Sequence, residues 1–263
     1  MIRKWRLMLT TLPYVAAMLG LKLGLHALNF KGLVEFSDVA MVLTGGVFLI
    51  GFMLAGTMSD YKESERLPGE VAAALETLEE TYAQAAMTRP TLDQRKLKEA
   101  VLHAGEGILD CLLGRRPRNE LYGVLDALRD TAGELERAGA GPYAGRSLAE
   151  LHGLRRFLTR VLVISRTGFL ASGYALLEAL TACIFGLLLV AAFKNLISEV
   201  TLVAFVSLIF TYMLRLIRDI DDPFEYSSDG NHGANEVELF PISDFCDRCR
   251  ARLATTEDLK AVG

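Results

Sequence analysis

Three ionisable residues lie inside or beside apolar stretches of the sequence, where a charge is costly and is therefore a candidate for function. They are Lys22, His26 and Glu178. Lys22 and His26 are four residues apart near the distal end of the first apolar stretch, where a lysine can extend its ammonium group to the membrane–water interface. We expect this of Lys22, with the attraction of anions as the alternative role. Glu178 would favour cations if it faced a pore.

Acidic residues gather after the last apolar stretch. Asp219, Asp221 and Asp222 offer carboxylate oxygens, which Ca²⁺ and Mg²⁺ prefer as ligands. Asp219 and Asp222 are spaced like the Mg²⁺–diphosphate ligands of membrane prenyltransferases, but those enzymes also need a second acidic motif on another helix. A solvated acidic loop before the next helix is the interpretation that we favour. No cofactor is therefore expected, and calcium remains the alternative.

Cys246 and Cys249 form a lone Cys-x-x-Cys motif. A closed zinc site needs four ligands, and only His232 lies nearby in the sequence. Both cysteines fall in an arginine-rich segment with a helical pattern, so we expect ordinary thiols. The sequence contains no nucleophile–base pairing, phosphate-binding glycine loop or His-Glu-x-x-His motif, and an enzyme is not predicted.

The overall composition requires apolar and charged residues to be segregated along the chain. The 263 residues are 51% hydrophobic and 23% charged, with a net charge of −4. Because no basic stripe dominates any stretch, a nucleic-acid partner is not expected. The four cysteines lie in segments that look membrane-buried or cytoplasmic, so a disulfide framework is not predicted either. The basic and apolar N-terminal segment is interpreted as a retained membrane anchor.

Four apolar stretches predict four transmembrane helices. The second, Val39 to Ser59, contains no charged residue, and at about 1.5 Å per residue it just crosses the roughly 30 Å hydrocarbon core of a bilayer. The first runs from about residue 7 to 30. The third and fourth have shorter charge-free cores, 179–193 and 200–214, which predicts helices that continue beyond the membrane.

The distribution of basic residues predicts the orientation of these helices. Basic residues flank the start of the first stretch, follow the second, precede the third and close the fourth, whereas the two short connecting loops hold only Lys31 and Lys194. Both termini and the central block are therefore expected to be cytoplasmic, in a multi-pass protein of the cell (inner) membrane.

The central block has the periodicity of helices. Its first apolar stripe, with Pro68 interpreted as a first-turn proline, consists of Leu67, Val71, Leu75, Leu78 and Tyr82. Further helical patterns follow, and a long helix that begins near Ser147 is expected to run on into the third apolar stretch. No strand pattern competes, so the fold class is an all-α membrane protein. We divide it into 1–60, helices one and two; 61–166, a cytoplasmic helical domain; 167–218, helices three and four; and 219–263, a cytoplasmic loop and helix.

Several separated segments resemble the bestrophins, a family of pentameric membrane channels with bacterial relatives. The polar, charged segment Thr57 to Pro68 resembles the segment by which the second helix of that family leaves the membrane. The fourth stretch and the following Asp222-Pro-Phe224 are similar to its last transmembrane helix and Asn-Pro-Phe turn, and 238–246 resembles a bacterial helix start. Leu170 to Tyr174 is in the place of the family's Ile-Pro-x-x-Tyr.

The second apolar stretch is the candidate for a pore neck. Leu43, Val47, Ile50 and Leu54 form an apolar stripe, which in a ring of subunits can line a throat that closes by dewetting. The resemblance implies that Leu43, Val47 and Gly51 occupy neck positions. Packing against a neighbouring helix or lipid is the alternative for such a stripe.

The same resemblance implies further features of a channel. It assigns Leu170 to a cytoplasmic constriction. Lys22 and Glu178, selected above as ionisable residues in or beside apolar stretches, are the candidates for ion selectivity. We therefore expect a homo-oligomer in the lipid bilayer, a pentamer by resemblance, that passes chloride or other small inorganic anions. A cation-permeable channel of the same architecture and a non-conducting membrane scaffold are the alternatives.

Overall fold

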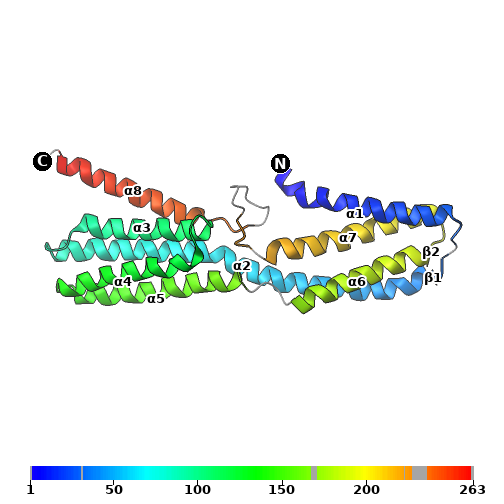
Figure 1. The fold of residues 1–263 in the computed structure, drawn as a ribbon, viewed down its shortest axis with the longest axis horizontal. Coiled ribbons are helices and arrows are strands. Elements are labelled where there is room, and N and C mark those ends of the chain that lie inside the picture. Colours follow the sequence, from blue (N-terminus) through cyan, green and yellow to red (C-terminus); the bar gives the residue numbers. More distant parts are fainter. Residues whose placement is uncertain (1, 31, 167–170, 222, 227–235, 262–263) are drawn as a thin grey trace. The chain divides into compact units, whose positions relative to one another are not determined.

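The computed structural model describes residues 2–30, 32–166, 171–221, 223–226 and 236–261. The chain divides into two compact units. The first unit consists of Met1–Tyr61 with Thr167–Pro223, and the second of Lys62–Arg166 with Phe224–Gly263. Helix α2 contributes residues to both units, because it runs without interruption over Phe36–Thr88 (Figure 1).

The first unit is built from long apolar helices. They are α1 (Ile2–Ala27), the first part of α2, α6 (Ala171–Val190) and α7 (Leu196–Asp221). Each of these four helices contains a segment long and apolar enough to cross a membrane. In Figure 1, α1 lies along α7, and α6 lies along the first part of α2.

A short parallel strand pair joins two loops of the first unit. Strand β1 (Val34–Glu35) pairs with β2 (Ala191–Ala192), with Val34 opposite Ala191. The loop before β1 passes so close to β2 that a Cβ atom on Gly32 would lie 2.8 Å from backbone atoms of Ala192. Gly32 also has a φ of +76°, which favours glycine. The prediction that no strand forms is wrong here, because two residues are too few to produce an alternating pattern.

Apolar side chains fill the interior of the first unit. Ile50 from α2 packs with Leu177 and Ile184 from α6 and with Phe210 from α7. Gly46 permits this approach, since a Cβ atom there would lie 2.6 Å from Ile184 Cδ1 and 3.1 Å from Phe210 Cζ. Close contact between α2, α6 and α7 therefore leaves the interior of the first unit filled by apolar side chains.

The second unit is a bundle of amphipathic helices. It contains the later part of α2, α3 (Gln94–Leu112), the 3₁₀ turn η1 (Arg118–Glu120), α4 (Leu121–Arg137), α5 (Gly141–Ile164) and α8 (Phe240–Ala261). The predicted apolar stripe of α2 is confirmed, because every member from Leu67 to Tyr82 is buried. Tyr82 donates a hydrogen bond of 3.4 Å to the carbonyl of Leu128 on α4.

Two predicted helix boundaries are wrong. Pro68 lies inside α2 and not in a first turn. One proline removes a single helical hydrogen bond, and the buried stripe on both sides of it outweighs that loss. The helix expected to continue into the third apolar stretch ends at Ile164, since Ser165 and Arg166 form a turn.

Candidate functional site

The predicted neck residues on α2 do not share one environment. The side chain of Ile50 is only 3% exposed and lies in the core of the first unit. Val47 is 49% exposed, and Gly51, one turn further along, is also exposed. Leu43 and Leu54 are partly buried and pack against the same core as Ile50.

This arrangement corrects one part of the neck prediction. A side chain enclosed by its own subunit cannot line a pathway, so Ile50 is removed from the candidate pore. The open face of α2 is instead the one that carries Val47 and Gly51. Periodicity alone could not separate these residues, because a helix that is apolar all round has more than one apolar stripe.

Lys22 is buried, and the prediction that its ammonium group extends to the interface is wrong. Its Nζ donates hydrogen bonds of 2.9 Å and 2.7 Å to the carbonyl oxygens of Leu189 and Ala191. It also lies 3.3 Å from Glu199 Oε1 on α7. Lys22 thus satisfies one carbonyl at the end of α6 and one in β2, and neutralises an acidic residue.

Glu199 is the centre of a small ionic cluster that the sequence analysis missed. Its carboxylate contacts Lys22 through one oxygen and His26 Nδ1 through the other, at 3.0 Å. The imidazole of His26 is half-exposed, whereas the carboxylate is almost fully buried. The available signal was the rule that charges inside membrane proteins occur in pairs, which predicts an acidic partner for Lys22 but does not say which of Glu35, Asp38 and Glu199 it is.

Glu178 also has a partner. Its carboxylate accepts a hydrogen bond from the guanidinium group of Arg218 on α7. Both side chains are more than half exposed, so the pair lies on the surface of the first unit. A paired carboxylate contributes little net charge, which weakens the argument that Glu178 would favour cations.

The predicted constriction and part of the predicted acidic cluster lie outside the residues that the structure describes. Leu170 and Asp222 are among the residues that the structure leaves undescribed. Asp219 is exposed and Asp221 half-buried at the end of α7. Within the described ranges, no group of three or more His, Cys, Asp or Glu side chains is arranged to hold a metal ion. The prediction for this segment, no cofactor with calcium as the alternative, stays a prediction.

The two cysteines of the Cys-x-x-Cys motif lie in the core of the second unit. Cys246 and Cys249 are both buried and form no disulfide. Burial raises the pKa of each thiol to about 11, which keeps both in the unreactive protonated form at neutral pH. Cys246 Sγ would be 2.9 Å from a Cβ atom on Gly105, so α8 lies very close to α3.

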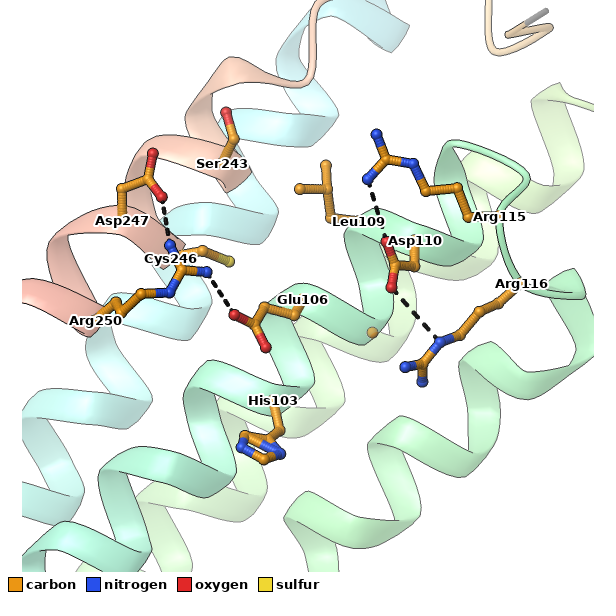
Figure 2. A pocket seen from close by; sticks show the side chains of 11 residues that line it. His103, Glu106, Leu109, Asp110, Arg115, Arg116, Ser243, Cys246, Asp247 and Arg250 are labelled. Atoms are coloured by element: carbon orange, nitrogen blue, oxygen red, sulfur yellow. Dashed lines mark hydrogen bonds and ion pairs between the residues drawn. The ribbon is translucent and has the colours of Figure 1, made fainter. Parts of the chain in front are cut away.

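A cavity of about 360 Å³ lies between α3 and α8 in the second unit (Figure 2). Arg250 bridges Glu106 and Asp247 on its wall, at 2.6 Å and 2.7 Å. One turn beyond Glu106 on α3, Asp110 lies 3.4 Å from Arg115 and 3.6 Å from Arg116. Because each of these carboxylates has a guanidinium partner, the polar wall connects α8 to α3 and leaves no isolated acidic group to hold a cation.

Comparison with known proteins identifies the fold. No protein-family model matches the sequence, and no curated protein matches it significantly. Solved structures of a bacterial bestrophin homologue from Klebsiella pneumoniae, however, match over nearly the whole chain. One variant of that protein has a TM-score of 0.74 at 16% identity, covering 95% of this chain and 96% of that one. Another has a TM-score of 0.68 at 17% identity, covering 96% and 98%.

A third structure of the same homologue, solved by zinc phasing, gives a TM-score of 0.69 at 17% identity and covers 95% of this chain and 96% of that one. The resemblance stated from the sequence is thereby confirmed for the fold, and the low identity fits a divergent chain.

Proposed function

We propose that this chain, with the fold of bacterial bestrophin homologues, is the subunit of a homo-oligomeric ion channel whose axial pathway is lined by α2. The observation that carries the proposal is the match of almost the entire chain, including four membrane-length helices, to that fold. A pentamer is the assembly that the family resemblance implies.

The pathway should lie between subunits, because the interior of one subunit is filled. Ile50, Leu177 and Phe210 are all buried in the centre of the first unit, and an apolar core of this kind gives an ion no hydrated route. Several copies of one helix face around an axis can enclose water that a single copy cannot.

The exposed face of α2 supports a narrow apolar neck. Val47 offers a half-exposed apolar side chain, and Gly51 leaves space one turn further along. Leu43 and Leu54 border this face. In a ring of subunits the valines would form a constriction that water leaves readily, which closes the pathway without a moving plug.

Small anions such as chloride are the proposed permeant ions. Lys22 and Glu178, the two charged candidates for selectivity, each have an opposite charge within contact. Selectivity would then depend on the width and hydration of the neck more than on either residue. A cation-permeable channel remains the alternative that a reversal potential distinguishes.

The proposed topology places both termini and the second unit in the cytoplasm. Its support is the excess of basic residues before the first apolar stretch, after the second, before the third and at the end of the fourth, compared with the two short connecting loops. Cysteine-accessibility labelling of the loop around Lys194 in intact spheroplasts would test this orientation.

Single-channel recording of the purified protein in planar bilayers tests the proposal. Val47→Thr keeps the shape of the side chain and adds a hydroxyl group, so it should hydrate the neck and raise the unit conductance. Ile50→Val is the matched control on the same helix. It should cost about 0.5–1.5 kcal/mol of stability through a buried methylene and leave the unit conductance unchanged.

Two outcomes would contradict the proposal. A wild-type protein that is monomeric, or that conducts no ions under a wide range of voltages, would favour the non-conducting scaffold. Equal conductances for wild type and Val47→Thr would remove the α2 face from the pathway. A reversal potential measured under a KCl gradient then separates anion from cation permeation, and Glu178→Gln shifts it only if the carboxylate lies near the permeating ion.

A further inference from the structure

Arg215 on α7 lies against an aromatic ring on α1. Its guanidinium carbon is 4.7 Å from the centroid of the Tyr14 ring. Stacking of this kind uses the flat face of the guanidinium group and leaves the N–H groups in its plane available for hydrogen bonds. The ring of Tyr14 is 54% exposed, so the stacked pair lies at the outer surface of the first unit.

Arg215 differs from the other basic residues of α1 and α7 for which contacts are described. Lys22 is neutralised by Glu199, and Arg218 by Glu178. Within the described ranges, Arg215 has no ion pair and donates no hydrogen bond. An unneutralised charge beside an apolar helix is unfavourable in a membrane unless water or a lipid headgroup supplies a partner.

The position of Arg215 along α7 brings it near lipid headgroups. It follows the charge-free run 200–214 directly and lies six residues before the end of the helix at Asp221, which is about 9 Å at 1.5 Å per residue. An arginine side chain can extend over most of that distance.

Helix α1 adds a second cation to this surface. Arg6 and Thr10 precede Tyr14 at spacings of four residues, so all three share one helix face, and all are exposed. On this face, Tyr14 lies near the middle of α1 and Arg6 lies toward the N-terminal end of the helix. No acidic residue occurs anywhere in α1.

We propose that Arg215 and Tyr14 form a binding site for the phosphate of an anionic phospholipid, at the surface formed by α1 and α7. The in-plane N–H groups of Arg215 donate to the phosphate oxygens, and the Tyr14 hydroxyl group is a further donor. Arg6 favours a headgroup with a net negative charge over a zwitterionic one. In the proposed orientation this site faces the cytoplasmic leaflet, where juxtamembrane basic residues attract anionic lipid.

Native mass spectrometry of the full-length protein in detergent tests the site, with phosphatidylglycerol and phosphatidylcholine of equal chain length as probes. Wild type should retain phosphatidylglycerol more strongly than phosphatidylcholine. Arg215→Gln should weaken phosphatidylglycerol binding roughly fivefold, which corresponds to about 1 kcal/mol for one arginine near an anionic headgroup.

Arg156→Gln is the matched control. Arg156 is also stacked on an aromatic ring, that of Phe157 at 5.2 Å, but it belongs to α5 in the second unit. Among the residues of this unit that the structure describes, no membrane-length segment lies outside α2. This variant should bind phosphatidylglycerol as wild type does. Because Arg215→Gln could reduce folding, Arg215→Lys provides a second variant that keeps the charge and loses the planar group, and it should bind with intermediate strength.

Three results would overturn the proposal. The first is equal phosphatidylglycerol binding by wild type and Arg215→Gln. The second is equal binding of the two lipids by wild type. The third is a rise in thermal stability with inorganic phosphate as large as that with phosphatidylglycerol, which would identify a site for free phosphate. None of them bears on ion conduction, so the lipid site and the channel proposal can fail separately.

Discussion

Replacement of Glu199 by glutamine should strongly destabilise the first unit. Lys22 Nζ lies 3.3 Å from Glu199 Oε1, and the two side chains are only 5% and 9% exposed. Glutamine keeps the size and an accepting oxygen, but it leaves the ammonium group of Lys22 with two backbone carbonyls and no negative charge. Removing one partner of a buried ion pair costs about 3–5 kcal/mol.

The expected change is large enough to measure by thermal unfolding. At about 2–4 °C per kcal/mol for a chain of this size, the loss corresponds to a fall in Tm of about 6–20 °C. Circular dichroism of the purified protein in one detergent, at a fixed protein concentration, provides the measurement. The double variant Lys22→Met with Glu199→Gln should recover most of the loss, because it removes both buried charges.

A matched control distinguishes this pair from ion pairs in general. Lys96 and Glu134 lie 2.9 Å apart in the second unit, but their side chains are far more exposed, so Glu134→Gln should change Tm little. If Glu199→Gln left Tm unchanged, or if the double variant were no more stable than the single one, the inference that burial makes this pair essential would be refuted.

Three further predictions concern packing and protonation. Gly46→Ala should cost about 1–3 kcal/mol because its Cβ atom would overlap the core, whereas Gly45→Ala, with open space around it, should not lower Tm. Burial raises the pKa of Cys246 to about 11, so its neutral thiol stabilises the fold below pH 9 and this contribution is lost as the pH rises toward 11. Between pH 9 and 11, the denaturation midpoint of Cys246→Ala should therefore fall less than that of wild type. The Arg160 guanidinium holds the pKa of Glu63 below its usual range, so wild type should exceed Arg160→Gln in Tm at pH 7, and the difference should shrink as acidification protonates Glu63.

The helices of the first unit could be predicted from composition because lipid imposes a simple requirement. A segment that crosses a bilayer must be predominantly apolar over about 20 residues, and each of the four apolar stretches found in the sequence coincides over most of its length with a long helix. The same uniformity explains the error at Ile50. Where every face of a helix is apolar, the sequence does not distinguish the face that meets the subunit's own core from the face that remains open.

The amphipathic helices of the second unit allowed finer prediction. In α2, each member of the stripe from Leu67 to Tyr82 proved buried, because polar residues on the other faces mark the solvent side. The partners of charged residues were not predictable in this way. Lys22 and Glu199 are brought together by packing between helices that are distant in sequence, and no local periodicity records such a contact.

The pairing of β1 with β2 ties together the two connecting loops of the first unit. Residues next to Gly32 and Ala192 belong to different helical hairpins, and the backbone hydrogen bonds between them, together with the buried Lys22, hold those hairpins at one end. Helices fastened in this manner can separate only by tilting about the fastened end. Any widening of the first unit should therefore be greatest at the ends of α6 and α7 that lie away from the strand pair, where the Glu178–Arg218 pair is exposed and easily broken.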